Sequence, residues 1–187
     1  MRIILILFFF FIFTSLGIYA QDSLTNKLNT SLLFGYQVGG QGENRNFVTK
    51  NGISVQLNLL YKFNNFISAG PGIGYAYVDE ETYIPAFITF KGFLKEKKNS
   101  PYLNARLGFS FVDNQKISAL ESFDFHGGLY FTAGWGYQWS LNEKVAIDFQ
   151  INMEFQETEL EFTSFSGEKF NDDIQNYFLS FKTGVNF

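Results

Sequence analysis

The sequence predicts an all-β fold, an eight-stranded antiparallel up-and-down transmembrane β-barrel. Three observations predict it. Eight segments alternate apolar residues with small or polar ones at a period of two, which is typical of strands with lipid on one side and a polar interior on the other. Aromatic residues make up 20% of the chain, more large rings than one soluble core of this size would accommodate. Short and long connections between the segments largely alternate, as they do in membrane barrels.

The first four segments each have about the 9–11 residues that a tilted strand needs to cross the hydrocarbon. In the second segment every odd residue from Ile53 to Phe63 is apolar. Asn64 and Asn65 follow it and predict a tight turn, because both tolerate positive φ. The third segment sets apolar residues against Ser68 and three glycines. The four segments are residues 28–38, 53–63, 67–77 and 83–94.

The last four segments repeat the pattern with larger rings. The sixth alternates Trp135, Tyr137 and Trp139 with glycine and glutamine. The eighth ends at Phe187, and its apolar face is opposite a face that contains Lys182. We expect this last strand to pair with the first and so close the barrel. The four segments are residues 103–111, 128–139, 145–155 and 177–187.

The N-terminus predicts export. Met1 and Arg2 precede an apolar stretch from Ile3 to Phe13, and small Ala20 stands before Gln21. One positive charge, a short apolar core and a small residue indicate a signal peptide over residues 1–20. Residues 21–187 then form one barrel domain. No cysteine is present, so neither a lipidated cysteine nor a disulfide is available.

Charge is distributed unevenly between the connections. The long connections, residues 39–51, 112–125 and 156–173, are mainly acidic, and the short ones carry lysines. From Glu157 to Glu161 the odd positions change from apolar to glutamate, so we expect the bilayer boundary near Phe155, with a ribbon that could continue above it. A basic tract with interleaved aromatics is absent, which argues against nucleic acid as a partner.

Six charged residues fall on the predicted inner face. An eight-stranded barrel has an interior just wide enough for its own side chains, and buried charges must be paired or hydrated. We therefore expect a lumen charge network that holds the barrel closed, in which Asp148 pairs with Lys182. The alternative is a charged plug or narrow pore. The six residues are Lys62, Lys91, Arg106, Asp148, Glu154 and Lys182.

A soluble eight-stranded barrel of the lipocalin kind is the alternative fold, with its apolar side chains inside. Two observations favour the membrane barrel. One face is rich in Gly, Ser and Asn, which fit a tight lumen, whereas the other is uniformly large. Trp and Tyr also lie near segment ends, as in the aromatic girdles of membrane barrels.

The chain resembles the small outer-membrane β-barrels of Gram-negative bacteria, of the OmpX/OmpA-transmembrane-domain type, and the porin-family proteins of Bacteroidota. Residues 68–75, 84–87 and 100–108 and the terminal Phe187 carry the resemblance. It implies the cell outer membrane as the location, with outer-membrane lipid, lipopolysaccharide and the barrel-assembly machinery as partners. It also implies an assembly signal formed by Phe181, Val185 and Phe187.

The only histidine, His126, is the one candidate for a catalytic base. A lipid A deacylase carries its catalytic serine two residues after its histidine, but here Gly127 and Gly128 follow His126. We therefore expect no enzyme, cofactor or metal site. The main hypothesis is a structural or surface-interaction protein that contacts an unknown extracellular ligand through its acidic loops. A narrow low-conductance pore and a lipid-modifying enzyme are the alternatives.

Overall fold

The computed structural model describes residues 27–43, 46–79, 81–95, 99–113, 123–142, 145–163 and 169–187. The predicted signal peptide, residues 1–20, lies outside the described residues, so its prediction stands untested. Within the described ranges, no helix is long and apolar enough to cross a membrane.

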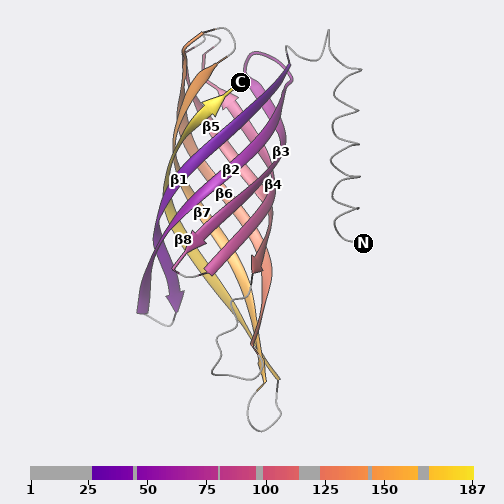
Figure 1. Ribbon diagram of the computed structural model, residues 1–187, viewed down its shortest axis with the longest axis vertical. Helices are drawn as coiled ribbons and strands as arrows, with labels where there is room; N and C mark the ends of the chain where they lie inside the picture. Colours follow the sequence, from indigo (N-terminus) through magenta and orange to yellow (C-terminus); the bar gives the residue numbers. More distant parts are fainter. Residues whose placement is uncertain are drawn as a thin grey trace, which may run out of the picture.

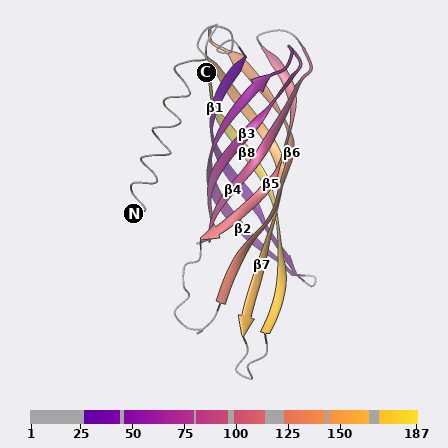
Figure 2. The ribbon, with the colours of Figure 1, turned by 90° about the vertical axis from the view of Figure 1, so that its right-hand side faces the viewer.

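The chain folds into a single closed barrel in which every strand pairs antiparallel with its neighbours in sequence (Figures 1 and 2). The predicted fold class is confirmed. The eight strands are β1 (Leu28–Glu43), β2 (Asn46–Lys62), β3 (Ile67–Val78), β4 (Glu81–Phe93), β5 (Ser100–Asp113), β6 (Phe123–Ser140), β7 (Ala146–Thr163) and β8 (Lys169–Asn186).

The barrel closes between the first and last strands, as predicted. β1 and β8 pair from Ser31 opposite Asn186 to Gln41 opposite Asn176. The backbone of Phe187 adds two further hydrogen bonds to Thr30, at 2.8 and 2.9 Å. Closure gives β1 and β8, which would otherwise be edge strands, a partner along this ladder.

Connections divide the barrel into two ends. We call the end with the β2–β3, β4–β5 and β6–β7 connections the turn end, and the opposite one the loop end. The predicted turn at Asn64 and Asn65 lies at the turn end, but neither residue has positive φ. The Asn64 side chain instead accepts hydrogen bonds from the backbone N–H groups of Phe66 and Ile67, both at 2.8 Å, which is the Asx type of turn.

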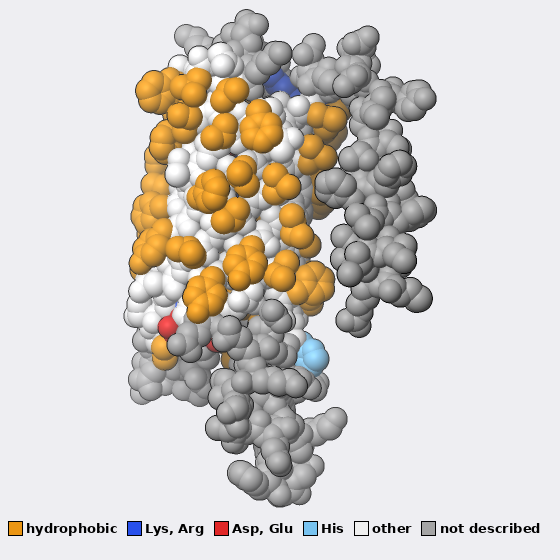
Figure 3. Space-filling model, viewed as in Figure 1, with side chains coloured by type: hydrophobic (Ala, Val, Ile, Leu, Met, Phe, Trp, Pro, Cys, Tyr) orange, Lys and Arg blue, Asp and Glu red, His pale blue; other side chains and the backbone are white. Residues whose placement is uncertain are grey.

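The two faces of the wall have opposite chemistry. Apolar side chains cover the outer surface as a broad belt (Figure 3), and small or polar residues such as Ser54, Asn58 and Ser180 point inward and are buried. This excludes the lipocalin arrangement, in which the apolar side chains fill the interior. The belt has the composition of a surface that faces lipid.

Several strands are longer than the apolar pattern predicts. The predicted loop 39–51 is wrong over most of its length, because β1 continues to Glu43 and β2 begins at Asn46. In the segment 156–173 the ribbon that the sequence allows above Phe155 is present, because β7 continues to Thr163 and β8 begins at Lys169. In Figures 1 and 2, β7 and β8 extend beyond β3 and β4 at the loop end. Of the third predicted loop, residues 114–122 lie outside the described residues.

The outer face of β7 changes character where the sequence predicts. Phe155 is the last of its outward apolar residues, and Glu157 and Glu159 follow on the same face. Between them, Gln156 and Thr158 stay buried in the lumen. The strand therefore continues without a change of register while its outer surface turns from apolar to acidic.

Candidate functional site

The lumen is the part of the molecule where charged groups gather. Of the six predicted inner-face charges, Lys91, Arg106, Asp148, Glu154 and Lys182 are all buried. Lys62, the sixth, is half-buried at the end of β2. Among the residues that the structure describes, Lys62 forms no ion pair with the other five.

Toward the turn end, Asp148 of β7 is held by two side chains from non-adjacent strands, Lys91 of β4 and Tyr102 of β5. The Lys91 ammonium lies 2.6 Å from Asp148 Oδ2, and the Tyr102 hydroxyl donates to Oδ1 at 2.7 Å. Lys91 also lies over the Tyr102 ring, 4.7 Å from its centroid. Glycine at position 136 makes room for that ring, since a Cβ there would meet Tyr102 atoms at 2.5 Å.

The predicted pair of Asp148 and Lys182 is wrong. On the adjacent strands Asp148 is opposite Gly184, and Lys182 is opposite Gln150. The Lys182 ammonium lies 2.8 Å from Glu154 Oε1 instead. The sequence prediction considered neighbouring strands alone, whereas a side chain in a narrow lumen can also reach the opposite wall, as Lys91 of β4 reaches Asp148 of β7.

Glu154 connects most of the circumference. Its carboxylate forms the ion pair with Lys182 of β8 and also accepts hydrogen bonds from Gln37 of β1 at 2.9 Å and from the Tyr130 hydroxyl of β6 at 3.1 Å. Gln56 of β2 in turn donates to the Tyr130 oxygen at 3.0 Å. The carboxylate of Glu154 therefore joins four strands directly, and Tyr130 connects it to a fifth.

Arg106 of β5 is fully buried, with 0% exposure. Its guanidinium donates to Asn104 Oδ1 at 3.2 Å and to Gln150 Oε1 at 2.6 Å. The Phe87 ring lies 5.9 Å from the guanidinium carbon. All of these contacts are with uncharged groups.

A second, more apolar layer lies toward the loop end. Ala76, Val78, Tyr83 and Phe178 pack together as one buried cluster inside the barrel, which we call the aromatic layer. The Tyr83 hydroxyl hydrogen-bonds to the Glu81 carboxylate. That carboxylate also pairs with the Lys50 ammonium at 2.9 Å.

Sequence reasoning assigned no role to the aromatic residues of the lumen. Tyr83, Tyr102, Tyr130, Phe87 and Phe178 are buried inside, although aromatic residues in membrane barrels usually mark the lipid face. The sequence signal that could identify them is their odd or even position within the strand. Each shares that position with the small and polar residues that point inward, so the alternation indicates the face although the side chain is hydrophobic.

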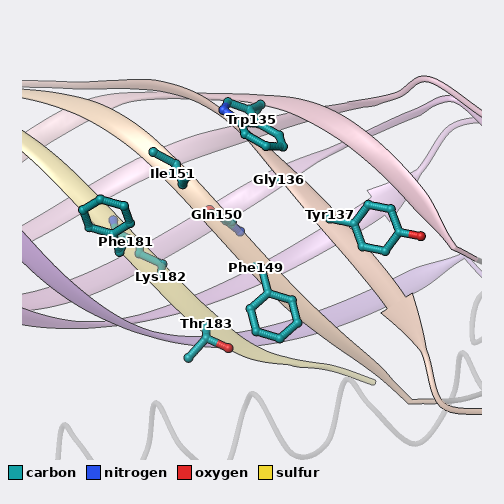
Figure 4. Close-up of a pocket in the computed structure, with 9 residues that line it drawn as sticks. All are labelled: Trp135, Gly136, Tyr137, Phe149, Gln150, Ile151, Phe181, Lys182 and Thr183. Carbon is teal, nitrogen blue, oxygen red and sulfur yellow. The ribbon is translucent and has the colours of Figure 1, made fainter.

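The outer surface carries a shallow groove of about 500 Å³ across β6, β7 and β8. Its rim is formed by outward side chains, and Figure 4 shows the rings of Trp135, Tyr137 and Phe149 standing out from the wall. The groove belongs to the apolar belt, and its lining offers no cluster of titratable groups. The residues around it are Trp135, Gly136, Tyr137, Phe149, Gln150, Ile151, Phe181, Lys182 and Thr183.

The remaining candidates lie on the outside of the barrel. His126 is exposed near the start of β6 and stands opposite Glu159 of β7. Over the described ranges, no group of three or more histidine, aspartate or glutamate side chains is placed to hold a metal ion. The predicted assembly residues Phe181, Val185 and Phe187 are exposed on the apolar face, and their recognition stays a prediction.

Comparison with known proteins shows which solved structures have a similar fold. No protein-family model matches the chain, and no curated protein matches it. Among solved structures it is similar to outer membrane protein AlkL (15% identity, 86% of this chain and 89% of that chain, TM-score 0.60). It is also similar to outer membrane protein OprG from Pseudomonas aeruginosa (10% identity, 85% of this chain and 95% of that chain, TM-score 0.59). A third similar structure is Neisserial surface protein A (12% identity, 86% of this chain and 97% of that chain, TM-score 0.56). The chain thus has the fold of small outer-membrane β-barrels.

Proposed function

We propose that the protein is a non-enzymatic β-barrel of the bacterial outer membrane whose lumen is closed by its own side chains. Its role is structural or interactive, exerted through the surface at the loop end. The observation that carries the closed lumen is the filling of the interior by two layers, the charged contacts around Asp148 and Glu154 and the aromatic layer above them.

Two observations support the outer membrane as its location. Large apolar side chains, among them Leu57, Ile73 and Phe181, are about half exposed all around the barrel. Such a surface is costly in water and favourable against lipid tails. The solved structures with a similar fold include two described as outer membrane proteins.

The loop end supports the interaction role. Glu157 and Glu159 lie on the outer face of β7 above the last apolar residue, and the sequence adds Glu161, Asp172 and Asp173 nearby. The charge of an acidic rim just beyond the hydrocarbon would favour cationic partners, either a basic surface of an extracellular protein or divalent cations that bridge the rim to lipopolysaccharide phosphates.

Two observations support a non-enzymatic role. His126 is the only histidine in the chain, and it is exposed on the outer face of β6. A general base acts together with a nucleophile within hydrogen-bond reach, and the two residues after His126 are glycines.

A narrow low-conductance pore is the second candidate, because the lumen wall is rich in polar atoms that need hydration. Buried side-chain atoms of Gln56, Ser110, Asn152 and Asn176 have no hydrogen-bond partner within the protein. Buried polar groups of this kind usually bind ordered water, and a continuous file of water would conduct small ions.

Conductance separates the two candidates. Refolded protein inserted into planar lipid bilayers is expected to show no stable single-channel steps, because side chains obstruct the lumen at two levels. A Tyr83→Ala/Phe178→Ala variant, which empties the aromatic layer, is expected to raise the frequency of current events. The matched control is Ile84→Ala/Leu179→Ala, which truncates the next residues along the same strands on the outward face and should leave the record silent.

Stable and uniform steps from the unmodified protein would contradict the closed lumen and favour the pore. Insertion is verified separately by vesicle flotation, so that an absent current is not confused with an absent protein.

A further inference from the structure

The buried charges of the lumen do not balance. Lys50 pairs with Glu81, Lys91 with Asp148 and Lys182 with Glu154. These pairs use every carboxylate that the described part of the lumen contains, and Arg106 is left over. An uncompensated charge in a low-dielectric interior is costly. A guanidinium cannot relieve this cost by losing its proton, because it stays protonated at any physiological pH.

The two side-chain amides beside Arg106 accept hydrogen bonds from it through their oxygens, and their N–H groups have no hydrogen-bond partner. Asn104 and Gln150 each turn the amide oxygen to the guanidinium. Their amide nitrogens, Asn104 Nδ2 and Gln150 Nε2, therefore have no partner within the protein. Arg106 Nε also has no partner.

Thr132 provides a fourth buried donor with no hydrogen-bond partner. It lies directly opposite Arg106 on the neighbouring strand β6, it is fully buried, and its hydroxyl has no partner. Four buried atoms that can donate hydrogen bonds, Arg106 Nε among them, thus lie on the same stretch of β5, β6 and β7, and none of the four has a hydrogen-bond partner within the protein.

We propose that this stretch of the lumen is a binding site for a small inorganic anion such as chloride, held by Arg106, Asn104, Thr132 and Gln150. Water could occupy the free donors, but water does not neutralise the guanidinium, whereas an anion does both. The anion must be small, because an eight-stranded barrel leaves little room beside its own side chains. The site requires no open pore, since the anion can be enclosed as the barrel folds.

Bromide is the probe, because it replaces chloride and scatters X-rays anomalously. Protein refolded and crystallised in sodium bromide is expected to show an anomalous peak within hydrogen-bond distance of the Arg106 guanidinium. In an Arg106→Gln variant the peak is expected to disappear. The matched control is Lys62→Gln, which removes a half-buried lumen cation at the turn end and should keep the peak.

A second measurement covers the case in which the Arg106→Gln barrel does not fold. Melting of the unmodified protein is followed as chloride is replaced by gluconate, an anion too large for the lumen, at constant ionic strength. The melting temperature is expected to decrease in proportion to the logarithm of the chloride concentration as chloride is removed, because a ligand that binds the folded state alone stabilises that state. A midpoint independent of the anion, or a site that shows only water in bromide crystals, would overturn the proposal.

Discussion

An Asp148→Asn substitution is expected to destabilise the barrel by about 3–5 kcal/mol, the cost of leaving one partner of a buried ion pair alone. Asparagine keeps the volume of the side chain but removes the charge that faces Lys91 at 2.6 Å. Lys91 is only 2% exposed, so its ammonium would stay buried without a counter-charge. The urea midpoint of unfolding from lipid vesicles measures the loss.

The control is a double variant, Lys91→Met with Asp148→Asn. It removes both charges, and replacing a buried ion pair by uncharged groups of similar size is often neutral. We expect it to recover most of the lost free energy, and the difference between the single and double variants gives the coupling of the pair. A loss below about 1 kcal/mol for Asp148→Asn, the range of an exposed ion pair, would show that the lumen is hydrated enough to screen the charge.

An Ile151→Arg substitution is expected to cost about 2–4 kcal/mol, the value for arginine at the bilayer midplane on the lipid face of a barrel. Ile151 occupies the middle of the outward apolar stretch of β7, which runs from Ile147 to Phe155. Its side chain points outward in the row between Trp135 and Phe181. The same unfolding assay in vesicles measures the effect.

Glu157→Arg is the matched control, because it places the same charge on the same face of the same strand, beyond the change from apolar to acidic residues. Its effect is expected to stay within about 0.5 kcal/mol, as for most surface substitutions. Equal effects at the two positions would contradict a bilayer boundary near Phe155.

The apolar part of every strand can be predicted from the sequence, whereas the extension of the strands beyond it is indicated at β7 alone, where the glutamates allow a ribbon above Phe155. Within the belt, one face must be apolar and the other must fit a narrow lumen, so the residues alternate and the register can be read directly. Beyond Val38 glycines and polar residues replace the apolar side chains, and beyond Phe155 the odd positions change to glutamate, so the apolar outward pattern ends although the ladder continues. Predicted loops therefore occupy positions where β1, β2, β7 and β8 pair in register.

The lumen network shows a second limit of the sequence. Parity identifies Lys91, Asp148 and Lys182 as inward residues, but it does not say which of them meet, because inward side chains of non-adjacent strands also touch. The contact of Lys91 with Asp148 joins β4 to β7, and the contact of Gln37 with Glu154 joins β1 to β7. Such contacts depend on barrel radius and strand tilt, which a single sequence does not specify.

The central claim is that the large side chains outside the barrel face lipid, and the two tryptophans of the chain test it most directly. Trp135 and Trp139 both lie on the outer face, 56% and 53% exposed. Single-tryptophan variants, Trp139→Phe and Trp135→Phe, are reconstituted in vesicles of phospholipids brominated at different depths of the acyl chain. Bromolipid is expected to quench both, with Trp135 more sensitive to deep bromines and Trp139 to shallow ones. Tryptophans that ignore bromolipid and are quenched by aqueous iodide would contradict a lipid-facing barrel.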